Sequence, residues 1–225
     1  MSARKRLLLA AIALGLLALL IAALMVGVYA ATQLVPEDYL QALQADPSRQ
    51  AAGSDRMLEK ATALASELEK EGPWSAIFTA EEINGWLAVD LVENHPDALP
   101  SGISDPRVVV RPEQLILFCR YERRDFESVL SLSVDAYVAE PNVVAFRICK
   151  ARAGMLPLPL SDVLEELTKT AQRMNLRIRW RQTEGDPVAL ITLPPRRDED
   201  GKQVQVTELR LGDGKIYLAG STSEQ

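Results

Sequence analysis

The N-terminal end of the chain carries a long apolar segment, which constrains the fold more than any other feature of the sequence. Residues 7–35 include no charged side chain, and the densest part, 7–28, consists only of Leu, Ala, Ile, Val, Gly and Met. As a helix, residues 7–28 would span roughly 33 Å, which is enough to cross a hydrocarbon core about 30 Å thick. Because a backbone in lipid must satisfy its own hydrogen bonds, we predict a transmembrane helix over 7–31.

Charged residues on either side of this helix predict its orientation. Three basic residues, 4–6, lie in a predicted cytoplasmic tip, 1–6, and two acidic residues, 37 and 38, follow the helix. The positive-inside rule therefore places the N-terminus in the cytoplasm and the bulk of the chain outside the cell membrane. The alternative is a signal peptide cleaved after residues 28–30, but signal peptides have shorter apolar regions of about 7–15 residues.

Composition excludes several classes of function. The formal net charge is −6, whereas nucleic-acid binding needs a cationic surface. The chain has one histidine, His95, and two cysteines, and these lack the spacing of a zinc site. The sequence also lacks the motifs of a nucleophilic serine, a phosphate-binding loop and a zinc protease. We therefore expect no catalytic activity, no cofactor, no metal and no nucleic-acid partner.

Charge and periodicity divide the remaining chain into a helical part and a strand-rich part. Residues 36–105 hold 14 acidic and 4 basic residues, while the remainder is nearly neutral. A short helix is expected to begin at Pro36, since proline is favoured in a first turn, and to end near Asp46-Pro47. Apolar residues at helical spacing predict a second helix over about 54–71. We expect these helices to form a juxtamembrane linker over 32–73.

The second part has the pattern of an antiparallel sheet. A capping box of Thr79 and Glu82 first indicates a helix that runs to about residue 93. Alternating apolar and polar residues then predict strands. The predicted elements are strands over 115–122, 128–138 and 143–152, a helix over 162–174, strands over 176–181 and 188–193, and a hairpin turning at 212–214. The predicted fold class is α+β, with a curved antiparallel sheet meander packed on one or two helices in an extracytoplasmic domain, 74–225.

The order of these elements resembles that of a known group of proteins. A lone membrane helix is followed by the segment Phe78-Thr79-Ala80-Glu81-Glu82-Ile83-Asn84-Gly85-Trp86-Leu87 and a strand meander. Next come Ala153-Gly154-Met155-Leu156-Pro157-Leu158-Pro159, a helix, and strands that end in an Asp213-Gly214-Lys215-Ile216 hairpin. Over about 78–220 this is similar to the YpmS-like family of bacterial single-pass membrane-anchored proteins. The resemblance implies an extracytoplasmic α+β domain and no assigned enzymatic activity, and it supplies no catalytic residues.

The two cysteines are expected to stay unpaired. Cys119 and Cys149 lie on the first and third strands of the predicted meander. Alternate strands lie about 9–10 Å apart, whereas a disulfide needs Cα atoms within about 7 Å. We therefore expect two free thiols that act as small core residues, although an oxidising compartment would favour a bridge.

Two surfaces are candidates for binding. The first is apolar, because the loop 154–160 carries more apolar residues than a surface loop usually does. Its candidate contacts with a hydrophobic ligand or with the membrane are Trp86, Met155, Leu156, Leu158 and Leu160. The second is an anion-docking face formed by alternate residues of one strand, Arg177, Arg179 and Arg181; the plain alternative is a solvated, ion-paired sheet face.

The sequence leaves two functions open, and both need only binding. The favoured hypothesis is a membrane-anchored interaction module without catalytic activity, whose partner is another protein or a second copy. The alternative is a domain that binds lipid or another hydrophobic ligand in an apolar groove between sheet and helices. An enzyme would need a cleft with converging titratable groups, which the sequence does not indicate.

Overall fold

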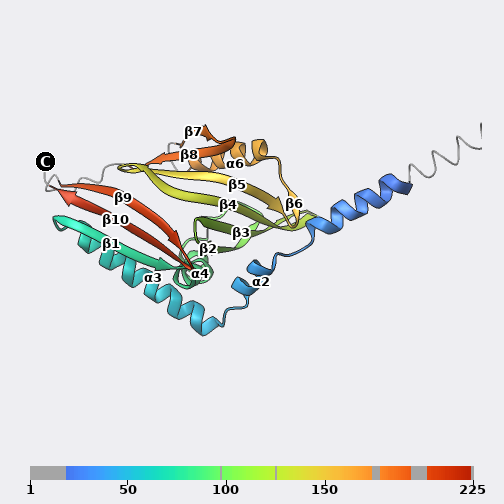
Figure 1. Cartoon of the computed structure of the whole chain (residues 1–225). Coiled ribbons are helices and arrows are strands. Elements are labelled where there is room, and N and C mark those ends of the chain that lie inside the picture. The colour runs from blue at the N-terminus through green and yellow to red at the C-terminus, as the bar shows by residue number, and fades with distance from the viewer. Residues whose placement is uncertain (1–18, 97, 125, 174–177, 194–201, 224–225) are drawn as a thin grey trace, which may run out of the picture.

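The computed structural model describes residues 19–223, apart from 97, 125, 174–177 and 194–201. It confirms the α+β class. Two antiparallel sheets lie beside each other, and a helix protrudes from one end of the folded part (Figure 1). The seven-stranded sheet has the order β2-β3-β4-β5-β8-β7 with β6 on β5, and the three-stranded sheet has the order β1-β10-β9.

Helices predominate in the first part of the chain and strands in the second. The helices are α2 (Glu37–Leu43), α3 (Pro47–Leu68), α4 (Ala80–Ala88), α5 (Asp90–Asn94) and α6 (Leu160–Arg173). The first six strands are β1 (Gly72–Thr79), β2 (Ile103–Arg111), β3 (Gln114–Arg123), β4 (Phe126–Glu140), β5 (Val143–Ala153) and β6 (Leu156–Pro157). The remaining strands are β7 (Ile178–Thr183), β8 (Asp186–Thr192), β9 (Gln203–Gly212) and β10 (Lys215–Ser223).

The apolar N-terminal segment is helical over residues 19–32, and residues 19–30 of this helix are exposed. Leu24 and Met25, for example, are each 67% exposed. Within the described residues, one segment, Leu19–Leu43, is long and apolar enough to cross a membrane as judged by length and composition. We call residues 19–32 the anchor helix.

The register of the seven-stranded sheet explains why the cysteines are free. Cys119 on β3 pairs with Leu130 on β4, and Cys149 lies on β5, so β4 separates the two thiols. Ser133 pairs with Lys150 and Val134 with Ile148, which leaves Cys149 as the extra residue of a β-bulge. Both cysteines are free, as the predicted strand order required.

One sequence prediction is corrected at the start of the folded part, and one strand was not predicted. The short helix ends near Asp46-Pro47 as predicted, since α2 ends at Leu43, but the second helix begins at Pro47 and not at about residue 54: the Ser48 amide donates to Asp46 Oδ1 at 2.8 Å, and Pro47 occupies the first turn. Residues 72–79 form the strand β1, because they pair with Thr222 through Lys215 of β10. The Gly-Pro pair that stops a helix therefore also begins a strand.

Helix α2 packs on the face of the seven-stranded sheet that lies away from α4. Tyr39 is fully buried, stacks on Phe118 with ring centroids 5.6 Å apart, and donates its hydroxyl to the Asp105 carbonyl at 2.9 Å. Asp38 forms an ion pair with Arg111 at 2.7 Å. The helices predicted as a linker thus contact the sheets directly, while the boundary between a linker, 32–73, and a domain, 74–225, stays a prediction.

Helices α3 and α4 approach each other so closely that only glycine fits at their contact. A Cβ atom on Gly85 would lie 2.6 Å from the Gln50 carbonyl oxygen and from the Ser54 amide nitrogen. On the facing helix, a Cβ atom on Gly53 would lie 2.8 Å from the Glu81 carbonyl oxygen. These neighbours are backbone atoms and cannot rotate away, so the contact sets the distance between the two helices.

Replacing Gly85 with Ala should lower the free energy of unfolding by about 1–3 kcal/mol, because the methyl group overpacks the helix contact. Without that contact, Gly→Ala in a helix would stabilise the protein by up to about 1 kcal/mol, so the sign of the change is informative. Urea unfolding of the full chain in detergent, followed by circular dichroism, measures it. Gly212→Ala is the control, since its nearest new contact is 3.4 Å away on the flexible Lys215 side chain.

Candidate functional site

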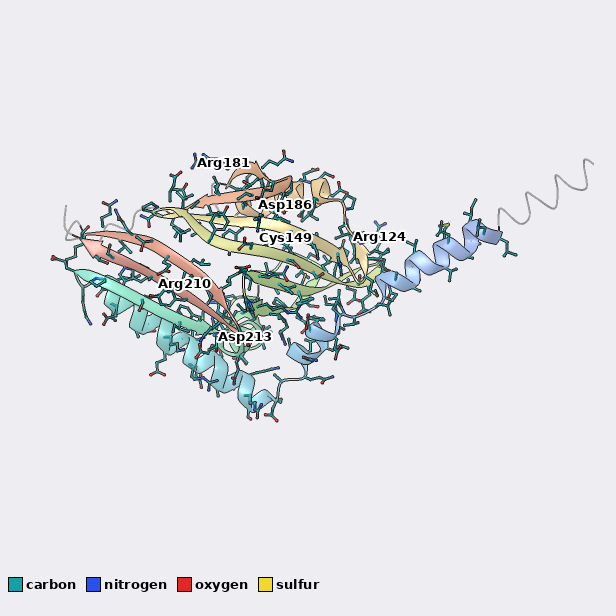
Figure 2. The ribbon with its side chains drawn as sticks, viewed as in Figure 1. Arg124, Cys149, Arg181, Asp186, Arg210 and Asp213 are labelled. Carbon is teal, nitrogen blue, oxygen red and sulfur yellow. The ribbon has the colours of Figure 1, made fainter. Side chains whose placement is uncertain are left out.

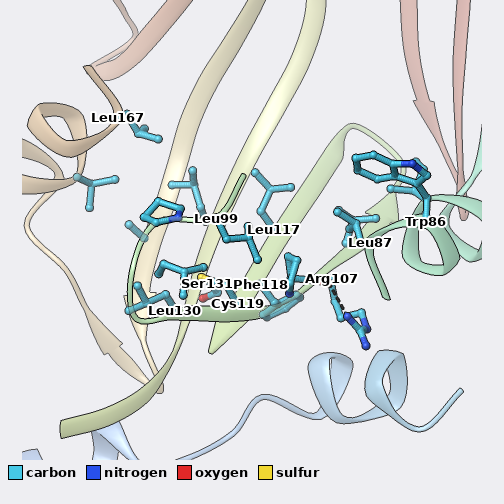
Figure 3. A pocket seen from close by; sticks show the side chains of 18 of the residues that line it. Trp86, Leu87, Leu99, Arg107, Leu117, Phe118, Cys119, Leu130, Ser131 and Leu167 are labelled. Carbon is cyan, nitrogen blue, oxygen red and sulfur yellow. Dashed lines mark hydrogen bonds between the residues drawn. The ribbon is translucent and has the colours of Figure 1, made fainter. Parts of the chain in front are cut away.

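A large apolar cavity lies between one face of the seven-stranded sheet and the helices α4 and α6. Its volume is about 790 Å³, within the range of roughly 300–1,000 Å³ that is typical of ligand pockets. Figure 3 shows Leu167 of α6 on one side and Trp86 and Leu87 of α4 on the other. Apart from Arg107, Ser131 and Arg152, every lining residue has an apolar side chain or the thiol of Cys119.

The floor of the cavity comes from the alternation of β3, β4 and β5. Leu117 pairs with Leu132, and Cys119 pairs with Leu130, so these four residues lie on one face of the sheet. Ala151 on β5 pairs with Leu132 and extends the same face. Leu117 keeps 38% of its surface exposed although it points toward the centre of the protein, so the floor is only partly covered.

The two arginines in the wall do not place their charge in the cavity. Arg107 pairs with Phe118 and points toward α2, where its Nη1 donates to the Pro106 carbonyl at 2.7 Å (Figure 3). Arg152 alternates with Ala151 and Ala153 on β5 and is exposed on the outside. The interior is therefore suited to hydrocarbon and unsuited to a charged group.

Helix α4 supplies Ile83, Trp86 and Leu87 to the cavity, and its position is held by side-chain hydrogen bonds. The Asn84 amide donates to the Val108 carbonyl at 2.8 Å, and the Val108 amide donates to Asn84 Oδ1 at 2.7 Å. This pair of bonds fixes α4 on β2. The sequence contains Asn84 in the segment that carries the family resemblance, but its role depends on a contact 24 residues away.

Glu82 fixes the beginning of the same helix. It closes the predicted capping box: its Oε2 accepts from the Thr79 amide at 2.9 Å, and its own amide donates to Thr79 Oγ1 at 3.2 Å. Glu82 is 4% exposed, and Lys60 Nζ lies 2.8 Å from its Oε1. Burial alone would raise the pKa of Glu82, but the hydrogen bonds from Lys60 and Thr79 hold that pKa below its ordinary value of 4.5.

Helix α6 and the segment before β2 complete the walls. Val163 and Leu167 of α6 face the cavity, and Leu99 and Pro100 lie across its edge. The Trp180 indole donates to Thr168 Oγ1 at 3.0 Å, which ties α6 to β7. The sequence predicted the helix that carries Val163 and Leu167, whereas nothing in the sequence indicated a role for Leu99.

Cys119 is the titratable group on the cavity floor. Its surroundings are apolar, and burial raises the pKa of its thiol to about 11. It is therefore protonated at neutral pH and unsuited to be a nucleophile. Within the described residues, His, Cys, Asp and Glu side chains do not gather in groups of three or more that could hold a metal ion.

The anchor helix is docked on the end of the sheet that carries this cavity. The Met155 amide donates to the Ala31 carbonyl at 3.0 Å, and Ser128 Oγ donates to the Thr32 carbonyl at 2.7 Å. Gly154 lies so close that a Cβ atom there would be 2.5 Å from the Ala31 oxygen. Leu130, two residues after Ser128, lines the cavity, so its floor begins next to the anchor helix.

The structure brings together only some of the residues that the sequence proposed. Trp86 and Leu158 line the cavity. Leu156 is half-buried in β6 and Leu160 begins α6, and neither is part of the lining; Met155 is 62% exposed beside the anchor helix.

The structure describes two residues of the predicted arginine face. Arg179 and Arg181 are exposed on β7 and have no ion pair within the described part of the chain (Figure 2 labels Arg181). Arg177 lies outside the described residues.

Comparisons with family models, with curated proteins and with solved structures found no match for this chain. The YpmS-like resemblance therefore stays a prediction that rests on the order of elements and on the motifs at 78–87, 153–159 and 213–216.

Replacing Glu82 with Gln should lower the free energy of unfolding by about 1–3 kcal/mol at pH 7. The substitution removes the buried carboxylate, and with it the charged hydrogen bond from Lys60. Since the folded-state pKa is below 4.5, this stabilisation is complete above pH 4.5 and is lost as the pH falls through the lowered pKa. Urea unfolding at a series of pH values measures the difference. Glu81→Gln is the matched control, because Glu81 is exposed and its pair with Arg56 is worth about 0–1 kcal/mol.

Alkylation of Cys119 should be slow at pH 8 and should accelerate up to about pH 11, because only the thiolate reacts. A Cys149→Ser variant leaves Cys119 as the one reactive thiol, and mass spectrometry after timed iodoacetamide treatment gives the rate. At pH 8 we expect a rate roughly 100-fold below that of free cysteine. A rate that levels off below pH 9 would show that the thiol is not in an apolar cavity.

Proposed function

We propose that this protein is a single-pass membrane protein whose folded domain binds the acyl chain of a lipid taken from the adjacent bilayer. The observation that carries the proposal is the cavity of about 790 Å³, whose lining is almost wholly apolar: the buried Arg107 points from it toward α2, and Arg152 is exposed on the other side of β5. An apolar cavity of this size loses packing contacts along its lining, so it costs stability unless a ligand fills it.

The position of the anchor helix supports a lipid as the occupant. The apolar residues 19–28 are exposed, as expected of a helix whose surroundings are lipid. The end of this helix is hydrogen-bonded to β4 and to the residue Met155, which follows β5. The cavity floor begins at that junction, with Leu130 and Leu158. A lipid could then leave the bilayer and enter the cavity without crossing a long polar surface.

The orientation that we propose follows from the charges beside the anchor. Basic residues 4–6 place the N-terminus in the cytoplasm and the folded domain outside the cell membrane, as in the YpmS-like proteins that the chain resembles. We propose a binding role without catalysis, because the cavity presents one thiol with a raised pKa and no facing base. The interaction module favoured by the sequence stays a second hypothesis, which an apolar cavity of this size supports less directly.

The test uses the full chain reconstituted in vesicles that contain a trace of phosphatidylcholine with a diazirine at the end of one acyl chain. Light then forms covalent bonds with whatever the chain end touches, and peptide mapping locates them. We expect labelling of peptides from 115–132, which form the cavity floor, in addition to labelling of the anchor helix.

Leu117→Trp should reduce labelling of the cavity peptides several-fold, because the larger side chain fills the space above the sheet. Tyr137→Trp is the matched control on β4, since Tyr137 is 36% exposed and lies outside the cavity. Labelling of the anchor helix serves as an internal reference and should be equal in all three proteins. Labelling confined to the anchor helix in the wild-type protein would refute lipid binding by the domain.

A further inference from the structure

A second hollow adjoins the apolar cavity and has a different character. Its volume is about 590 Å³, and it shares Pro100, Ile103 and Leu130 with the lining of the apolar cavity. The remaining walls carry polar side chains from β3, α6 and the turn before β2: Ser101, Tyr121, Glu122, Arg123, Glu166 and Thr170. We call this hollow the polar chamber. An apolar cavity joined to a polar chamber has the two-part chemistry of an amphiphile.

Arg123 is positioned to face the chamber. On β3, Cys119, Tyr121 and Arg123 alternate with residues of the opposite face, so Arg123 lies on the face that forms the cavity floor. Its guanidinium has no ion pair within the described part of the chain and its side chain is exposed. The carboxylate on the facing helix, Glu166, already lies 3.9 Å from Lys169 of its own helix. Arg123 is therefore the cation available to a ligand in the chamber.

The chamber lies at the end of the domain from which the anchor helix departs. Arg123 is the last residue of β3, and the following hairpin places Arg124 beside the foot of the anchor helix (Figure 2). Gln33 Nε2 donates to the Glu127 carbonyl at 2.7 Å, which ties the start of β4 to the end of the anchor helix. The polar chamber is thus close to the level at which lipid head groups would lie.

We infer that the ligand is a glycerophospholipid, whose phosphate contacts Arg123 in the polar chamber while an acyl chain occupies the apolar cavity. This inference rests on the proposed function and adds the head group. Arginine pairs with phosphate oxygens through two parallel hydrogen bonds, and the Tyr121, Ser101 and Thr170 hydroxyls supply further donors. A chamber of 590 Å³ is far larger than a fatty-acid carboxylate requires, and a neutral glyceride would leave Arg123 without an anion.

The test compares three lipids in the full chain reconstituted in vesicles. Each carries the same diazirine-tailed acyl chain, and they are phosphatidylcholine, diacylglycerol and the free fatty acid, present in trace amounts. We expect phosphatidylcholine to label peptides 115–132 roughly fivefold to tenfold more than either other lipid, after normalisation to the anchor helix. Arg123→Gln should bring that ratio close to one, and diacylglycerol labelling should not change.

Arg124→Gln is the matched control, because the neighbouring arginine is equally exposed on the hairpin but does not line the chamber. It should keep the preference for phosphatidylcholine. Equal labelling by all three lipids, or a preference that survives Arg123→Gln, would overturn the head-group inference and leave lipid binding intact. If no lipid labels the cavity peptides, the proposed function itself fails. Preferential labelling by the fatty acid would identify a carboxylate ligand and would also overturn the inference.

Discussion

The pair of hydrogen bonds between Asn84 and Val108 holds α4 on the seven-stranded sheet, and the cavity depends on it. Two further constraints act on the same helix: Gly85 touches the backbone of α3, and Glu82 is held by Lys60 and Thr79. Apolar walls normally close over an empty space, because packing recovers lost contacts. Here each constraint involves backbone atoms or the buried Glu82 carboxylate, so α4 keeps its place while Trp86 and Leu87 face the cavity.

The same rigidity extends from the cavity to the anchor helix. The anchor helix is not joined by a free linker, because Met155, Ser128 and Gln33 each bond it to the folded part. The apolar cavity adjoins the polar chamber, and both include Leu130, two residues after the Ser128 side chain that bonds to the anchor helix. A membrane lipid likewise joins an apolar chain to a polar head group, and this match is the physical basis for proposing a phospholipid as the ligand.

Sequence reasoning succeeded where the signal is local. The capping box at Thr79, the alternation along β3, β4 and β5, and the final hairpin depend on near neighbours and are confirmed. It placed the start of α3 at about residue 54 instead of Pro47 and did not predict β1 at residues 72–79, because the same proline-containing pairs can end one element or begin another. The cavity could not be predicted, because alternation shows that Leu117 and Leu132 share a face but not what covers that face.

Sequence alone was enough to predict the apolar N-terminal helix, the α+β class and the separation of the two cysteines by a strand, since each follows from composition, periodicity or strand order. The choice of which apolar face is buried and which lines a cavity was made by packing between distant segments. That choice depends on how far α4 and α6 stand from the sheet, and contacts distant in sequence, such as Gly53 with Gly85 and Asn84 with Val108, set that distance. A one-dimensional pattern carries no information about such spacing.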